Sequence, residues 1–91
     1  MSVAQFVQTI NALNGGNVYV TYPDEWEVIL KGSSKDVTVQ DLEVLPVGTS
    51  LSFAYDKPEE KSRYRAYWKK TEGPLGSFWH PTGSIKTMNL Q

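Results

Sequence analysis

Apolar residues near the start of the chain recur at spacings of three and four, which is the period of an amphipathic α-helix. This stripe is made of Val3, Phe6, Val7, Ile10 and Leu13. Ser2 and Gln5 at its start have the spacing of a capping box. Residues 14–16 read Asn-Gly-Gly, and glycine readily adopts the left-handed conformation that ends a helix. We therefore predict a helix over residues 2–14 whose apolar stripe packs on a sheet.

After this helix the period changes to two, which is the spacing of a half-buried β-strand. Residues 17–22 and 26–31 both alternate in this way, and Pro23 between them suits the second position of a tight turn. Residues 49–56 and 62–70 alternate as well, and a short charged connection joins them. The pattern therefore predicts a β-hairpin followed by a second pair of antiparallel strands.

Residues 37–47 fit two patterns. Two valines suggest a short strand, whereas Thr38 and Asp41 have the spacing of a helix start, with Leu42 and Leu45 following on one face. We favour a single helical turn in this segment.

The last part of the chain, residues 71–91, is rich in glycine and proline. These residues favour turns and irregular backbone, so the segment is predicted as a loop. Brief strands near residues 77–79 and 84–90 are compatible with the same pattern.

Together these elements predict one α+β domain spanning residues 1–91. Its N-terminal helix packs on a four- to five-stranded, mainly antiparallel sheet, whose strand order the pattern does not give. The apolar fraction of 40% and the charged fraction of 21% are ordinary for a small soluble globular domain. A chain of 91 residues can also bury one core without disulfides.

Composition excludes several classes of protein. The absence of cysteine excludes a disulfide framework and thiolate zinc sites. No apolar run approaches the ~18 residues that a membrane-spanning helix needs, so no membrane association is expected. The first residues lack the basic region of a secretory signal. We therefore expect a cytoplasmic protein, in the host cytoplasm if it is viral.

Residues 61–70, KSRYRAYWKK, hold five cations and three aromatic rings in a chain whose net charge is −1. Period two divides them between two faces of a strand. One face carries Arg63, Arg65, Tyr67 and Lys69, and the other carries Tyr64, Ala66, Trp68 and Lys70. Because burying two unpaired arginines would be costly, we predict that the first set faces outward and is a candidate binding surface.

Phe78, Trp79 and His80 form a second aromatic cluster within the segment predicted as loop. We include all three among the candidate partner-binding residues, since loops on a rigid sheet often carry function. The alternative is that Phe78 and Trp79 close the open end of the core. His80 has no cysteine, second histidine or nucleophile motif to work with, so we assign no catalytic residue and no metal site.

Three interpretations of the outward cations remain open. They form ion pairs with acids such as Glu27 on a solvated face, they dock an acidic protein surface, or they contact nucleic-acid phosphates while Tyr67 stacks on a base. A pI near 5.7 disfavours a dedicated nucleic-acid binder.

We expect a small non-enzymatic interaction or regulatory module without a cofactor, such as an inhibitor, adaptor or phage-type accessory protein. Weak binding of nucleic acid or a nucleotide by the same strand is the alternative. An unpaired edge strand also makes a homodimer possible.

Overall fold

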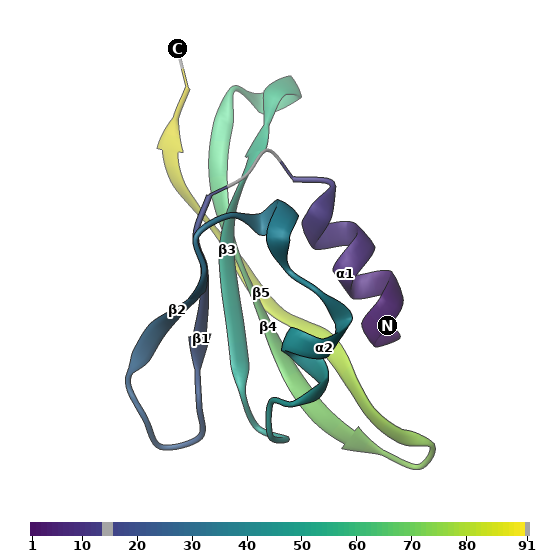
Figure 1. Cartoon of the computed structure of the whole chain (residues 1–91). Coiled ribbons are helices and arrows are strands. Elements are labelled where there is room, and N and C mark those ends of the chain that lie inside the picture. The colour runs from purple at the N-terminus through teal and green to yellow at the C-terminus, as the bar shows by residue number, and fades with distance from the viewer. Residues whose placement is uncertain (14–15, 91) are drawn as a thin grey trace.

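The computed structural model describes residues 1–13 and 16–90. Along the chain these residues form α1 (Val3–Asn11), β1 (Val18–Thr21), β2 (Glu27–Lys31), the 3₁₀ turn η1 (Ser34–Asp36), α2 (Val39–Glu43), β3 (Ser50–Lys57), the 3₁₀ turn η2 (Pro58–Glu60), β4 (Ser62–Gly73) and β5 (Gly76–Asn89). Within the described residues the sheet has five strands in the order β2-β1-β3-β4-β5, and all neighbours are antiparallel. Both α1 and α2 lie on one face of this sheet (Figure 1). The predicted α+β fold is therefore confirmed.

The helix α1 forms where the apolar stripe predicts it, but it is shorter than residues 2–14. Ser2 accepts a hydrogen bond from the backbone N–H of Gln5, and the Gln5 side chain reciprocates, so the predicted capping box is present. The predicted stop at residues 14–16 lies partly outside the described residues. Gly16, which is described, has a φ of +107°, a conformation that glycine adopts without a steric penalty.

Local sequence signals also place the next elements correctly. The backbone N–H of Glu25 donates to the carbonyl of Tyr22 at 3.0 Å, which closes the predicted turn between β1 and β2. Asp24 occupies the third position of this turn with a φ of +60°. Thr38 and Asp41 form a second reciprocal capping box, and α2 is the single short helix favoured from the sequence.

The prediction of a loop over residues 71–91 is wrong for most of that segment. β4 continues to Gly73, and β5 pairs with it over its whole length. Long-range pairing thus outweighs the local preference of glycine and proline for turns. Pro81 fits because β5 is an edge strand, where a missing N–H breaks no ladder bond on the outer side. Part of this outer edge is satisfied by Met1, which exchanges two backbone hydrogen bonds with Trp79.

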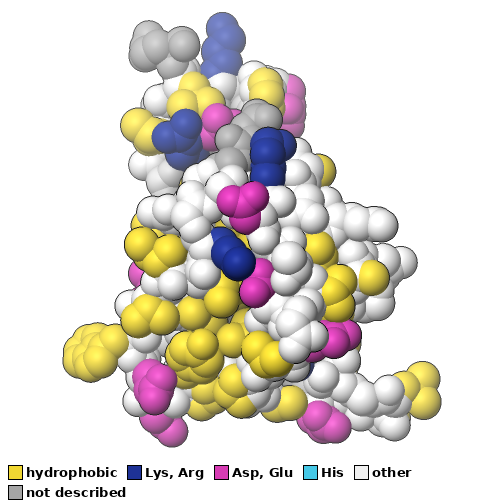
Figure 2. All heavy atoms as spheres, in the orientation of Figure 1, with side chains coloured by type: hydrophobic (Ala, Val, Ile, Leu, Met, Phe, Trp, Pro, Cys, Tyr) yellow, Lys and Arg dark blue, Asp and Glu magenta, His cyan; other side chains and the backbone are white. Residues whose placement is uncertain are grey.

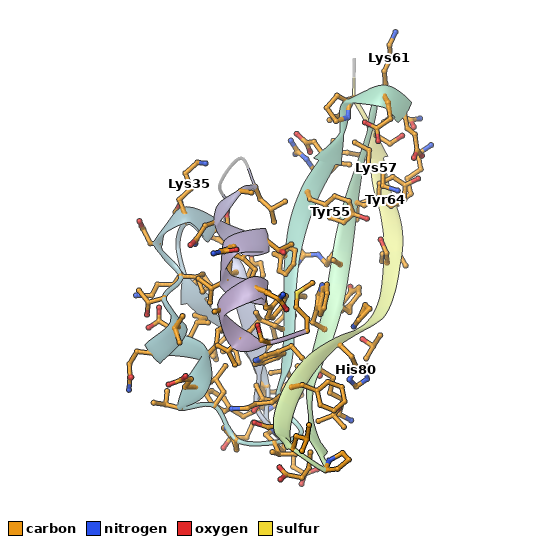
Figure 3. The ribbon with its side chains drawn as sticks, turned by 90° about the vertical axis from the view of Figure 1, so that its right-hand side faces the viewer. Lys35, Tyr55, Lys57, Lys61, Tyr64 and His80 are labelled. Atoms are coloured by element: carbon orange, nitrogen blue, oxygen red, sulfur yellow. The ribbon has the colours of Figure 1, made fainter. Side chains whose placement is uncertain are left out.

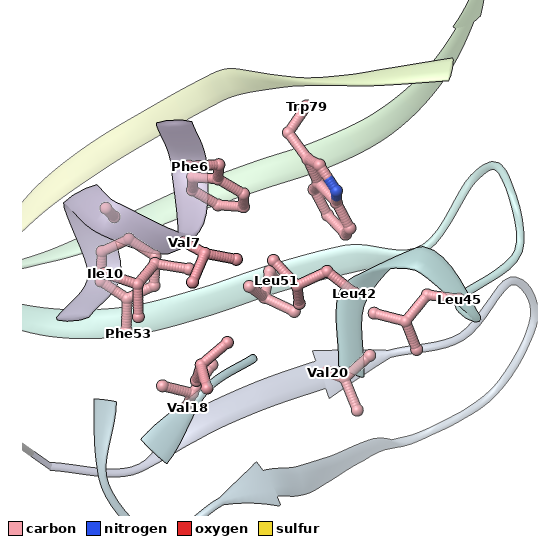
Figure 4. Packing of buried hydrophobic residues seen from close by; sticks show 12 residues of the cluster. Phe6, Val7, Ile10, Val18, Val20, Leu42, Leu45, Leu51, Phe53 and Trp79 are labelled. Carbon is pink, nitrogen blue, oxygen red and sulfur yellow. The ribbon is translucent and has the colours of Figure 1, made fainter. Parts of the chain in front are cut away.

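The core lies between the two helices and the sheet face that they cover (Figure 4). Phe6 stands at its centre, with ring centroids 4.5 Å from Trp68, 5.3 Å from Trp79 and 6.3 Å from Phe53. The fully buried large side chains around it are Ile10, Val18, Val20, Leu42, Leu51 and Trp79. Large rings supply much of the apolar burial, which suits a chain of this size.

Lys70 lies on the covered face with Tyr64, Ala66 and Trp68, as the strand period predicts, and it is buried. Its Nζ donates to the backbone carbonyls of Leu42, Glu43 and Leu45 at distances of 3.4, 3.1 and 2.8 Å. Leu42 and Glu43 end α2, and Leu45 follows two residues later. Carbonyls at the end of a helix lack partners within the helix. Lys70 therefore ties α2 to the sheet.

No helix among the residues described here has the length and apolar character needed to cross a lipid bilayer.

Candidate binding face of the sheet

The face of the sheet opposite α1 and α2, here called the open face, carries most of the predicted binding residues. Directly opposite residues in antiparallel strands share a face. Arg63, Arg65, Tyr67 and Lys69 are opposite Asp56, Ala54, Ser52 and Ser50 of β3, respectively. On the other side of β4, Lys69 is opposite His80 and Thr71 is opposite Phe78. The six residues Arg63, Arg65, Tyr67, Lys69, Phe78 and His80 therefore lie on one face, and their role in binding stays a prediction.

Trp79 does not belong to this set. Its side chain lies on the covered face, has no exposed surface, and packs on Phe6. A partner cannot reach it while the core is intact, so its assignment as a binding residue is wrong. The reason is the strand period: β5 sends neighbouring side chains to opposite faces, which separates Trp79 from Phe78 and His80. The alternative interpretation, that Trp79 closes the core, is the correct one for this residue.

Arg63 forms an ion pair within the open face. Its Nε lies 2.7 Å from Oδ1 of Asp56, and its Nη2 lies 3.4 Å from Oδ2. These hydrogen bonds hold the pKa of Asp56 below its ordinary value, and they raise the pKa of Arg63. Cross-strand pairing of the outward cations with acids was one of the three open interpretations, and for Arg63 the strand register selects Asp56 as the acid.

Arg65 is held by a different set of contacts. Its Nη1 donates to Oγ of Ser52 at 3.3 Å, and its guanidinium lies 5.1 Å from the ring centroid of Tyr19. The hydroxyl of Ser52 in turn donates to Oε2 of Glu27 at 3.5 Å. The predicted acid Glu27 is therefore linked to Arg65 through Ser52 rather than by a direct ion pair.

Sequence reasoning did not select Tyr19 for the site. The alternation of residues 17–22 already placed it opposite Val18 and Val20, which are buried, and so on the open face. Its contact with Arg65 depends on β1 lying next to β3, and the sequence did not give this strand order.

Tyr67, Lys69 and His80 form the centre of the open face toward β5. Tyr67 is half-buried and lies opposite Gly83. Lys69 is exposed and has no ion pair or hydrogen bond among the described residues. His80 shares a hydrogen bond with Thr71, at 3.0 Å from Nδ1 to Oγ1, and its ring lies 5.8 Å from that of Phe78.

The face as a whole mixes charge with apolar surface. Its three cations are opposed by the two carboxylates of Asp56 and Glu27. Toward its margins Ile29, Ile85 and Met88 are each at least half exposed. Within the described part of the chain, no three His, Asp or Glu side chains come together in a way that could hold a metal ion.

The sheet also has an unpaired edge at β2. The adjoining turn exposes 90% of Trp26, and Val28 and Ile29 on β2 are about half exposed. Figure 2 shows hydrophobic side chains gathered over the lower left of the helix side, while most Lys and Arg side chains lie in the upper half. An edge suitable for strand pairing therefore exists, and a homodimer through it stays a prediction.

Comparison of the chain with protein-family models, with curated proteins and with solved structures finds no match.

Proposed function

We propose that this protein is a non-enzymatic binding module that docks a protein partner through the open face of its sheet. The observation that carries the proposal is the cluster of Arg65, Tyr19, Tyr67 and Lys69 on the face opposite α1 and α2. In Figure 3, His80 and Lys35 lie on opposite sides of the molecule, and both helices are on the Lys35 side. Among the described residues, both helices lie on the other side of the sheet, so this face is available to a second molecule.

The composition of the open face supports a protein as the partner. Tyrosine, methionine and arginine are enriched at protein–protein interfaces, and all three are present here. Ile29, Ile85 and Met88 supply apolar surface at the margin. Arg63 and Arg65 are already oriented by Asp56 and Ser52, so less side-chain entropy would be lost when a partner binds.

The charge of the face supports an acidic partner surface. Asp56 already pairs with Arg63, and Glu27 accepts a hydrogen bond from Ser52. Lys69 keeps an uncompensated positive charge next to His80. A carboxylate from the partner would pair with Lys69, while Tyr67 beside it would supply ring surface for packing.

Single-stranded nucleic acid is the second candidate, and it rests on the half-buried ring of Tyr67 two residues from the exposed cation Lys69 on the same face. Bases stack on such rings, and cations nearby contact the phosphates. The two carboxylates on the same face oppose this function, because they repel phosphate.

The test is site-specific photo-cross-linking in host lysate. A cross-linking amino acid at Tyr67 should capture a discrete protein, and Lys69→Glu should abolish most of that capture. The same amino acid at Gln8, which is exposed on α1, and the charge reversal Lys35→Glu on η1 are matched controls on the helix side. Equal capture from residues 8 and 67, or capture unchanged by Lys69→Glu, would overturn the proposal.

Fluorescence anisotropy with labelled single-stranded oligonucleotides tests whether the partner is nucleic acid rather than protein. Binding through phosphates weakens steeply with salt, with a slope of about −0.7 per phosphate neutralised on a single strand. Binding that follows this slope and is lost in Lys69→Glu would replace the protein partner with nucleic acid. No binding at low salt removes nucleic acid from consideration.

A further inference from the structure

A groove with a volume of about 590 Å³ lies on the covered face, between the C-terminal end of α1 and strands β3 to β5. It exists because the long strands continue past the end of α1, so the sheet is not covered over its full length (Figure 1). Its main apolar lining residues are Leu13, Phe53, Tyr55, Ala66, Trp68 and Pro81. The groove is distinct from the open face, because it lies on the other side of the sheet.

The lining of the groove fits the body of a small apolar molecule. Its volume falls within the range of about 300–1,000 Å³ that is usual for ligand sites, and such sites combine apolar walls with a few polar groups. One polar pair lies in the wall: the hydroxyl of Tyr55 is 2.9 Å from that of Ser84. Two hydroxyls share one hydrogen in such a bond, so the second hydroxyl hydrogen is free to donate to a ligand.

Beyond Tyr55, the same face carries positive charge. Lys86 is directly opposite Tyr64 and two positions along β5 from Ser84. It has no ion pair within 4.0 Å among the described residues. Lys57 lies 4.7 Å from the ring centroid of Tyr64. Lys57, Tyr55 and Tyr64 are grouped at the upper end of the sheet in Figure 3.

The nearby carboxylate of Glu60 does not neutralise this group of lysines. It accepts a hydrogen bond from Tyr64 at 2.7 Å and forms an ion pair with Lys57 at 3.5 Å. These contacts, with a smaller contribution from Lys86, lower the pKa of Glu60. Glu60 pairs with Lys57, so the positive charge of Lys86 remains on the covered face beyond the Tyr55–Ser84 pair that lines the groove.

We propose that this groove binds a free medium-chain fatty acid. Its aliphatic chain lies against Phe53 and Trp68, and its carboxylate accepts a hydrogen bond from the Tyr55–Ser84 pair and faces Lys86. The apolar walls account for the chain, and the unneutralised lysine accounts for the single negative charge. This site does not depend on the binding function proposed for the open face.

Titration of the isotope-labelled protein with octanoate, followed by NMR, tests the site directly. The structure predicts saturable shifts of the Trp68 indole signal and of the Leu13, Tyr55 and Ser84 amides. The indole of Trp26, which is 90% exposed and far from the groove lining, should not move. No saturable shift at millimolar octanoate, or shifts at Trp26 in place of Trp68, would overturn the proposal.

A matched pair of alanines locates the binding. Ala66→Leu fills the groove, whereas Ala54→Leu adds the same volume on the open face opposite Arg65. We expect Ala66→Leu to weaken octanoate binding at least tenfold and Ala54→Leu to change it less than twofold. Equal affinity in the two variants contradicts the groove as the site. Should Ala66→Leu fail to fold, the titration of the wild-type protein decides alone.

The role of the carboxylate is tested by comparing octanoate with octan-1-ol. Lys86→Gln should weaken octanoate binding about fivefold and leave octanol binding unchanged. If Lys86→Gln affects neither ligand, or if octanol binds as tightly as octanoate, the site takes an uncharged apolar molecule and the proposed ligand class is wrong.

Discussion

The two faces of the sheet are built from the same strands, yet one is buried and the other contacts solvent. On the covered face, Val18, Val20 and Leu51 are fully buried beneath the helices. On the open face, the alternating neighbours Tyr19 and Ser50 remain in contact with solvent. Because successive side chains of a strand point to opposite faces, one sequence encodes both a core and a solvent-facing surface. Substitutions one residue apart can therefore change the core and this surface separately.

The two faces also satisfy their charges differently. Lys70 on the covered face donates to backbone carbonyls at and just beyond the end of α2 and is shielded from water. Arg63 on the open face pairs with Asp56, and its side chain is 43% exposed. Removing a buried charge-bearing partner leaves polar groups unsatisfied, whereas exposed ion pairs contribute little. The comparison predicts large effects on one face and small effects on the other.

The largest effect is expected from a matched pair of phenylalanines. Phe6→Ala removes a buried ring at the centre of the core and should lower the free energy of unfolding by about 3–5 kcal/mol. Phe78→Ala on the open face should lower it by less, because that ring is only partly buried. Urea denaturation followed by circular dichroism measures both. Similar losses in the two variants would contradict the difference in burial between the two faces.

The next effect concerns Lys70, which is buried on the covered face. Lys70→Met keeps the length and apolar stem of the side chain but removes its hydrogen bonds to the carbonyls of Leu42, Glu43 and Leu45. The expected loss of unfolding free energy is about 2–3 kcal/mol, since an unsatisfied buried polar group costs roughly 1–3 kcal/mol. Lys69→Met, the neighbouring change on the open face, is the control for urea denaturation. An unchanged midpoint in Lys70→Met would mean that α2 is held by its apolar contacts alone.

The contrast between the faces also decides how far the sequence could predict the structure. Helix α1, the first hairpin and the outward set on β4 follow from local period and capping residues, and the structure confirms them. β5 was missed because its glycines and Pro81 resemble a loop, and its pairing with β4 is a long-range contact. Trp79 was misassigned for the same reason: without a strand, the period that separates it from Phe78 cannot be applied.

The cross-strand contacts of the two arginines could not be predicted from the sequence for a related reason. That Arg63 would meet Asp56, and Arg65 would meet Tyr19, depends on strand order and register. Neither is encoded in the hydrophobic pattern of a single strand. The groove was likewise invisible, because it arises where α1 ends before the strands do.

Two substitutions at neighbouring residues of β1 compare the faces through smaller changes in the free energy of unfolding. Val20→Thr places a hydroxyl in the buried layer without a partner, which should cost about 1–2 kcal/mol of unfolding free energy. Thr21→Val makes the reverse change on the open face and should stay within about 0.5 kcal/mol of wild type. Thermal denaturation of both variants and of the double variant gives the result. A Val20→Thr protein as stable as wild type would show that its face is not sealed from water.

The smallest effect is expected from the ion pair of the open face, and pH makes it visible. Because Arg63 lowers the pKa of Asp56, the pair stabilises the fold fully above the unfolded-state value of about 3.9. That contribution is lost as the pH falls through the lower pKa of the folded state. Wild type should therefore be slightly more stable than Asp56→Asn near pH 7, and the difference should vanish in strong acid. Urea denaturation from pH 7 to pH 2 measures this difference.

In an Arg63→Gln background, Asp56→Asn should show no such pH-dependent difference, because the cation that lowers the pKa is gone. A difference that persists unchanged at pH 2, or that survives without Arg63, would mean that Asp56 stabilises the sheet by a route other than this pair.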